Sequence, residues 1–261
     1  MHSPTLEGIT DNKYAWWRLS ISLLICTIGS IGFWSVVVVL PAIEIEFGID
    51  RGSASFPYLA TLTGLAAGGI LMGRLADRFG IMAPLILGSV MLFFGYIAAA
   101  HANSLWQFVL AHAVLIGLIG SSATFSPLLA DISLWFTKRR GIAVALVASG
   151  NYLSGALWPP LLQYAIDEIG WRQAYIGIAF ICLITIFPLS FFLKRRPPLN
   201  LQTLKGLTTD NLPSAPPTVA PANAQALLVI AGLSCCIAMS MPQVHLVAYC
   251  GDLGLGAQRG A

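Results

Sequence analysis

A few polar and aromatic side chains interrupt long apolar stretches of the chain, where they could form hydrogen bonds to a small solute. They are Ser30, Trp34, His112, Asn151 and Tyr152. A polar group inside a membrane is costly unless it faces a cavity or a partner, so these residues are the candidates for a binding cavity. One of Asn151 and Tyr152 should face it. His112 could donate to an anion or relay protons near neutral pH, and a hydrogen bond to a neighbouring helix explains it equally well.

The sequence does not contain the residue patterns of an enzyme. His112 and Asp131 are too far apart along one helix for a catalytic dyad, and the five cysteines show no CxxC or Cys/His ligand spacing. We therefore predict no catalytic residues, no metal and no cofactor, and we interpret the cysteines as packing residues.

Composition indicates the elements that must position these candidates. Hydrophobic residues make up 57% of the chain and charged residues only 10%, whereas soluble domains carry roughly a quarter charged residues. The apolar blocks are about 18 to 25 residues long, enough to cross roughly 30 Å of hydrocarbon as helices. They are continuously apolar, which argues against a barrel. The prediction is an all-α, polytopic, multi-pass membrane protein with the lipid bilayer as its solvent.

We expect about seven transmembrane helices. Their approximate ranges are residues 17–41, 54–73, 82–101, 105–130, 141–164, 173–193 and 225–248. With a cytoplasmic N-terminus, the predicted inner segments hold most of the basic residues, including residues 138–140 and 194–196, while Arg51, Arg172 and Arg259 lie outside. This asymmetry predicts that orientation. It also argues against a seven-helix receptor or sensor, whose N-terminus would lie outside.

The pattern of blocks predicts three parts. Residues 1–193 form a six-helix bundle, and residues 194–224, rich in proline, form a cytoplasmic linker. Residues 225–261 add one further helix. Because a lone seventh helix would lack bundle partners, we expect the chain to be truncated, either as a fragment or as a shortened gene.

A short segment between the second and third predicted helices could act as a gate. It runs from Gly73 to Gly80 and places Asp77 and Arg78 in what we expect to be a tight turn. A carboxylate there can accept hydrogen bonds from helix N-terminal amides or pair with an arginine, and such contacts can break and reform. A basic loop that only sets topology is the alternative.

This segment resembles the signature loop of the major facilitator superfamily at Gly73, Leu75, Asp77, Arg78 and Gly80. Ile81 and Met82 depart from it, because the family usually has basic residues there. The resemblance implies a major facilitator fold, in which the first six helices form the N-terminal half and the last helix begins the C-terminal half.

A second stretch resembles the fifth-helix signature of monocarboxylate transporters. The matching residues are Phe136, Lys138, Arg139, Arg140, Ala143 and Gly150. The basic triplet would hold the inner end at the anionic leaflet, and the small residues would let a neighbouring helix approach closely. The acidic first-helix signature of the animal transporters is absent, so the oxalate/formate exchangers of bacteria fit better. This favours a bacterial inner membrane.

The resemblance implies a secondary carrier of small organic anions, mono- or dicarboxylates, that works by alternating access with protons or a counter-anion as coupling partner. No nucleic acid is expected as a partner. We find no arginine or lysine embedded in the first six predicted helices, so the charge partner of the substrate should come from the C-terminal half. A carrier of a neutral or cationic compound is the alternative. Asp131 is expected to pair with the basic triplet that follows it.

Overall fold

The computed structural model describes residues 12–195, together with residues 226–227, 230–231, 234 and 238, which are helical. The chain divides into two compact units, residues 1–197 and residues 198–260. The predicted linker at 194–224 and the predicted helix at 225–248 fall almost entirely outside the described residues. The fold below is that of the first unit.

Six helical segments of the described chain are long and apolar enough to cross a membrane. In order they are Lys13–Phe47, Gly52–Phe79, Met82–Ala100, Leu105–Trp135, Arg140–Ile169 and Trp171–Phe192. We refer to them as the first to sixth spans. They confirm an all-helical, multi-pass membrane protein.

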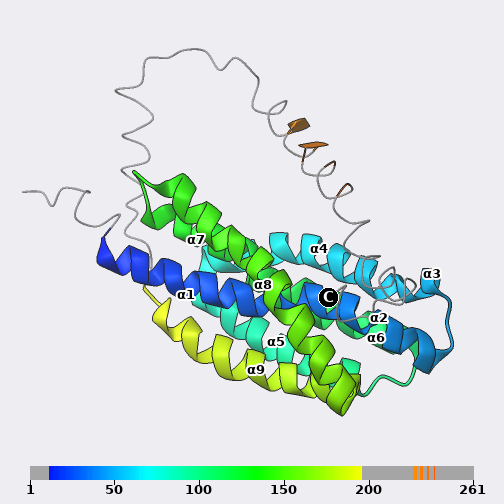
Figure 1. Ribbon diagram of the computed structural model, residues 1–261. Coiled ribbons are helices and arrows are strands. Elements are labelled where there is room, and N and C mark those ends of the chain that lie inside the picture. The colour runs from blue at the N-terminus through cyan, green and yellow to red at the C-terminus, as the bar shows by residue number, and fades with distance from the viewer. Residues whose placement is uncertain (1–11, 196–225, 228–229, 232–233, 235–237, 239–261) are drawn as a thin grey trace, which may run out of the picture. The chain divides into compact units, whose positions relative to one another are not determined.

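Three spans consist of a single helix and three of several elements (Figure 1). The first span comprises α1 (Lys13–Gly29) and α2 (Ile31–Phe47), and the second comprises α3 (Arg51–Ala54) and α4 (Phe56–Phe79). The third is α5 (Met82–Ala100), the fifth α8 (Arg140–Ile169) and the sixth α9 (Trp171–Phe192). The fourth comprises α6 (Leu105–Leu110), the π-helix η2 (Ala111–Ser121) and α7 (Ser126–Trp135).

Several helices are longer than their apolar blocks predict. The first span has 35 residues, which at about 1.5 Å per residue makes it longer than the roughly 30 Å of hydrocarbon. Its ends therefore extend past the apolar layer, where hydropathy no longer marks a helix. The same explains why α8 continues to Ile169, beyond the predicted end at residue 164.

The predicted tight turn from Gly73 to Gly80 is wrong. Gly73, Asp77 and Arg78 lie in the last turns of α4, and the helix ends only at Gly80. Gly80 has a φ of 87°, a left-handed conformation that favours glycine, and its amide still donates to the carbonyl of Ala76. Gly80 and Ile81 thus make the connection, while Gly73 remains helical.

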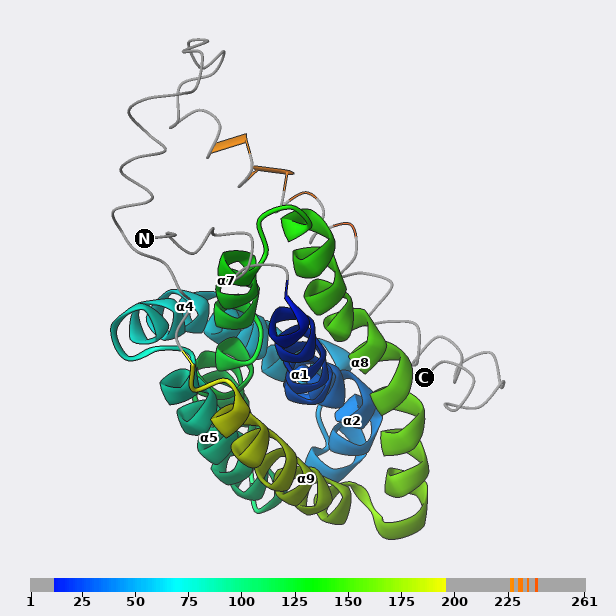
Figure 2. The ribbon, with the colours of Figure 1, turned by 90° about the vertical axis from the view of Figure 1, so that its left-hand side faces the viewer.

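The first span is the most enclosed of the six. Of its most apolar 18-residue window 67% is buried, against 22% for the second and fifth spans. Figure 2 shows α1 and α2 with α4, α5, α8 and α9 around them. Any cavity inside the bundle must therefore be bordered by the first span.

Glycines let the second span pack directly on the fourth. Gly64 and Gly68 lie one helical turn apart on α4, and a Cβ atom at either position would collide with the backbone of η2, at Ala113 or at Leu118. Small residues at this spacing allow the close approach of two membrane helices. The contact holds α4 against the middle of the fourth span.

We expect Gly68→Ala to destabilise the bundle by about 1 to 3 kcal/mol, since the added methyl group meets the carbonyl of Leu118 and backbone must move. The thermal midpoint of the detergent-purified protein should fall by several degrees. Gly177→Ala on α9 is the matched control, because nothing lies within 4 Å of that position. Equal midpoints for the two variants would contradict the glycine contact.

Candidate functional site

Two of the six spans are interrupted close to their midpoints. The first span breaks at Ser30, between α1 and α2, and the fourth breaks between Ser121 and Ser126. Ser30 is the central residue of its span, and Ser121 lies next to the centre of its own. Backbone groups freed at such a depth are as far from bulk water as the span allows, so the protein itself must provide partners.

The two breaks border one small cavity of about 80 Å³. Its lining residues are Ser30, Phe33, Leu65, Ser121, Phe125 and Asn151. Leu65 is central in the second span and Asn151 is near the centre of the fifth, so four spans contribute lining residues from their middle parts. Apolar walls with a few polar groups are the lining that a site for a small molecule has.

Of the adjacent pair on α8, Asn151 lines the cavity and Tyr152 does not belong to its lining. The backbone carbonyl of Asn151 accepts a hydrogen bond from the indole of Trp34 at 3.1 Å. Tyr152 is 59% exposed on the outer surface of α8. The structure thus brings Asn151 and Ser30 together and leaves Tyr152 apart.

Trp34 supports the cavity wall from behind. Its ring packs edge-on against Phe33 with centroids 5.1 Å apart, and Phe33 lines the cavity. A Cβ at Gly155 would collide with the Trp34 ring, so this glycine admits the indole between α2 and α8.

His112 is buried in η2 and does not belong to the cavity lining. Its Nδ1 atom lies 3.3 Å from the carbonyl of Phe108, and its Nε2 atom lies 3.4 Å from the hydroxyl of Tyr175 on α9. Because a carbonyl only accepts, Nδ1 carries the proton and Nε2 accepts from the tyrosine. This geometry corresponds to the alternative of a histidine bonded to a neighbouring helix.

The predicted gate residues lie at the end of α4. Asp77 and Arg78 are both exposed, and the Arg78 guanidinium lies 5.3 Å from the centre of the Phe79 ring. Gly73 has open space where a Cβ would project. The described residues therefore leave this end of α4 free for contact with other parts of the protein.

The residues of the fifth-helix signature divide into exposed and packed groups. Lys138, Arg139 and Arg140 are exposed, and Arg140 begins α8. Phe136 is buried, while Gly150 packs against the Cys26 side chain and the backbone of α1. The close approach that the small residues predict is thus present at Gly150.

A buried ion pair was missed in the sequence. Arg18 on α1 donates to both carboxylate oxygens of Asp131 on α7, at 2.8 and 2.9 Å, and is only 1% exposed. The prediction that Asp131 pairs with the basic triplet is wrong, as is the prediction that no arginine is embedded in these helices. A buried carboxylate needs a buried cation, and the triplet lies in solvent. In the sequence the pair can be seen as two opposite charges, Arg18 and Asp131, each inside an otherwise apolar block.

The Arg18 guanidinium has further partners. It donates to the carbonyl of Arg195 at 3.0 Å, just beyond α9, and lies 4.7 Å from the centre of the Trp135 ring. One side chain therefore joins the ends of the first, fourth and sixth spans.

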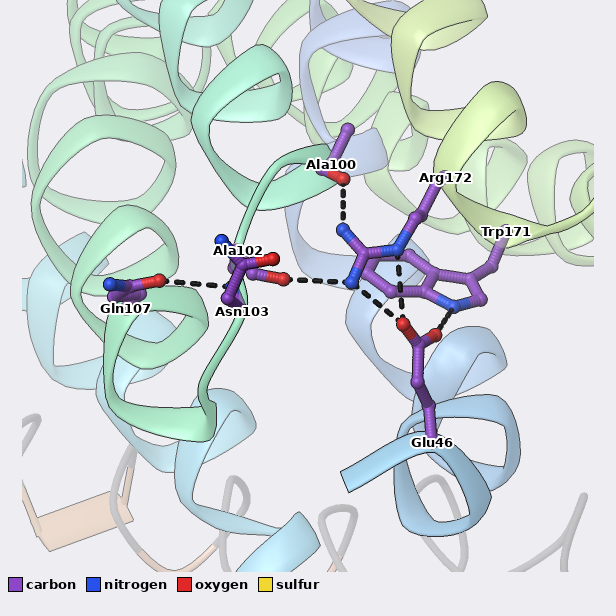
Figure 3. A network of polar contacts seen from close by, with 7 residues as sticks. All are labelled: Glu46, Ala100, Ala102, Asn103, Gln107, Trp171 and Arg172. Carbon is purple, nitrogen blue, oxygen red and sulfur yellow. Dashed lines mark hydrogen bonds and ion pairs between the residues drawn. The ribbon is translucent and has the colours of Figure 1, made fainter.

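A second polar cluster joins the opposite ends of the spans (Figure 3). Arg172 pairs with Glu46 at 2.7 Å and donates to the carbonyls of Ala100 and Ala102. The Trp171 indole donates to the other oxygen of Glu46. Since Ala100 ends α5, the guanidinium offsets the negative end of that helix. Through Glu46 it also joins this end to the last turn of α2.

Metal ligation is not indicated in the part of the chain that the structure describes. There, no group of three or more His, Cys, Asp or Glu side chains is placed to hold an ion. The cavity can instead offer hydrogen bonds from the Ser30 hydroxyl and the Asn151 amide within apolar walls, whereas the Ser121 hydroxyl donates to the carbonyl of Gly29.

Comparison with known proteins identifies the type of membrane protein. The family model described as Major Facilitator Superfamily matches residues 22–261. The chain is 33% identical over 134 residues to the MFS-type transporter pynF of Aspergillus niger, covering 51% of this chain and 31% of that protein. It is 35% identical over 115 residues to the Fujikurins efflux protein of Gibberella fujikuroi, covering 44% and 24% respectively.

An animal protein and a solved structure also match. Monocarboxylate transporter 6 of Mus musculus is 28% identical over 179 residues, covering 67% of this chain and 38% of that protein. A crystal structure of the peptide transporter POT, an E310Q mutant in complex with sulfate, aligns with a TM-score of 0.52 at 19% identity and covers 91% of this chain and 49% of that one. The chain spans about a third of the length of the relatives it matches, and the structural likeness concerns the fold.

We expect Asp131→Ala to cost about 3 to 5 kcal/mol of stability, because it leaves the Arg18 guanidinium buried without a counter-charge. The double variant Arg18→Met with Asp131→Leu should regain most of this loss. Thermal midpoints in detergent measure both, and Arg140→Met serves as an exposed control. A double variant as unstable as the single one would contradict the pairing.

Proposed function

The chain belongs to the Major Facilitator Superfamily, and we propose that it carries small organic anions, mono- or dicarboxylates, across the cell membrane by alternating access. The cavity between the two broken spans is the observation on which this proposal depends. Carriers of this kind bind their substrate near the bilayer midplane, beside discontinuous helices. Ser30, Ser121 and Asn151 are the polar groups at that depth.

Three observations support an organic anion as substrate. The Ser30 hydroxyl and the Asn151 amide can donate to carboxylate oxygens. The stretch from Phe136 to Gly150 resembles the monocarboxylate-transporter signature, and one matching relative is named a monocarboxylate transporter. The described lining contains no cation, so in this proposal the charge partner of the substrate comes from the C-terminal half. Protons or a counter-anion are the coupling partner.

Charge distribution supports a cytoplasmic N-terminus. Residues 138–140 and residues 194–195 are basic and follow the fourth and sixth spans, which end on the same side as the N-terminus. We propose residues 1–193 as the N-terminal half, residues 194–224 as its linker and residues 225–261 as the first helix of the other half. The relatives reported above are from fungi and a mouse, so we propose a cell membrane rather than a bacterial inner membrane.

Export of a neutral or cationic metabolite is the second candidate. One relative is named an efflux protein, and the mostly apolar lining of Phe33, Leu65 and Phe125 suits a less polar compound. The two candidates differ in the effect of a negative charge in the cavity, which would repel an anion and attract a cation.

We expect Asn151→Ala to reduce carboxylate uptake by about two- to tenfold, the effect of losing one hydrogen bond to the substrate. The full-length protein in liposomes would be tested with labelled pyruvate and oxalate. Asn151→Asp should abolish uptake of both, and Asn103→Ala, in an exposed loop, should not alter it. Normal uptake by Asn151→Ala would remove Asn151 from the site. If the unmodified protein takes up no carboxylate across a broad panel, the substrate class is wrong.

We expect Asp77→Asn to lower the maximal uptake rate and leave KM unchanged, because the exposed end of α4 acts on the conformational step and not on the cavity. A carboxylate can hold helix ends together through amide or guanidinium donors, and an amide does so less strongly. Initial rates over a range of pyruvate concentrations separate the two parameters. A raised KM at an unaltered maximal rate would contradict a gating role.

A further inference from the structure

We propose that Ser121 and Trp158 are positioning residues, which hold the break in the first span open so that Ser30 faces the cavity. This inference deepens the proposed function, since it assumes that the cavity is the substrate site. Neither residue is required to touch the substrate for this role. Each acts through a backbone carbonyl of the first span.

The break exposes carbonyl groups that a regular helix would satisfy internally. In an unbroken helix the carbonyl of Gly29 would accept from the amide of Phe33, four residues ahead. Here the Phe33 amide donates instead to the backbone carbonyl of Ser30, at 3.1 Å. The Gly29 carbonyl accepts from the Ser121 hydroxyl of the fourth span, at 3.1 Å.

Ser121 belongs to both breaks at once. Its own carbonyl accepts from the amide of Thr124 at 3.1 Å and from the Thr124 hydroxyl at 2.9 Å, which closes the turn between η2 and α7. Its hydroxyl reaches across to Gly29. The irregular backbone of the fourth span therefore presents the donor that the irregular backbone of the first span needs.

Close packing fixes this meeting point. A Cβ at Gly29 would overlap the Thr124 side chain, and a Cβ at Gly32 would collide with Ser121. The two glycines on either side of Ser30 are thus covered by the turn of the fourth span. The buried Ser121 hydroxyl has little freedom to choose another acceptor.

Trp158 holds the same break from the fifth span. Its indole donates to the carbonyl of Thr27 at 3.1 Å, one helical turn ahead of Ile31, where α2 begins. Trp34 makes the reverse contact from α2 to α8, by donating to Asn151. The first span is thus bonded to the fourth span through the carbonyl of Gly29. It is bonded to the fifth span through the carbonyls of Thr27 and Asn151.

Removing the Ser121 hydroxyl has a defined consequence. The Gly29 carbonyl, left in an apolar interior, gains most by accepting from the Phe33 amide again. That change straightens the first span and rotates Ser30 away from the cavity. Loss of the Trp158 indole favours the same change through Thr27.

Thiol labelling at position 30 tests the inference without any substrate. In the full-length protein in detergent, Ser30→Cys would be labelled with aminoethyl methanethiosulfonate, and the protein with native Ser30 provides the blank for the native cysteines. Adding Ser121→Ala should slow labelling about fivefold, which corresponds to about 1 kcal/mol. Trp158→Phe keeps the ring, removes the donor and should slow it in the same direction.

Matched controls separate positioning from general destabilisation. Ser122→Ala removes a neighbouring hydroxyl that bonds only within its own span, and Trp106→Phe alters a 69% exposed indole. Both should leave the labelling rate unchanged, and thermal midpoints show whether each variant is folded. If Ser121→Ala does not fold, the inference is tested by comparing the labelling rates of Trp158→Phe and Trp106→Phe. Unchanged labelling in the folded test variants, an equal slowing in the controls, or no labelling of Ser30→Cys alone would overturn the inference. A protein that labels as expected yet takes up no carboxylate would contradict only the proposed function.

Discussion

In hydrocarbon a backbone carbonyl or amide that leaves its helical partner must find another one inside the protein. The hydrogen bond from Ser121 to the carbonyl of Gly29 meets this requirement where two broken spans cross. The contact lies beside the cavity, because both breaks border it and both supply lining residues.

The two ends of the bundle are held by charge, and the middle is held by neutral hydrogen bonds. Arg18 and Asp131 join three spans at one end, and Glu46 with Arg172 joins the second cluster at the other. Full charges at the ends lie near headgroups and water, where desolvation costs less than at the centre. This arrangement leaves the central cavity free of charges from the described residues. The polar groups of its lining are neutral hydroxyl and amide groups.

Membership of a large superfamily explains the fold better than it explains the substrate. A peptide transporter shares the fold at 19% identity, and the named relatives include both an efflux protein and a monocarboxylate transporter. Such diversity is expected when the helical scaffold is kept and a few residues of the site change. In this chain Asn151 and Ser121 line the same cavity from different spans.

The sequence by itself determined the all-helical membrane class, the six described spans and the family, because apolar length and short glycine and basic patterns are local properties. It also identified Ser30 and Asn151 as candidates for the cavity lining. The tertiary structure decided which polar groups meet. The pairing of Arg18 with Asp131 joins residues 113 positions apart, and the role of Ser121 depends on a glycine 92 positions away. A regular i to i+4 pattern cannot show where a helix will break, since the break at Ser30 is stabilised by donors on other spans. Helix ends likewise followed backbone hydrogen bonding rather than hydropathy, which is why Asp77 proved helical and the connection fell at Gly80 and Ile81.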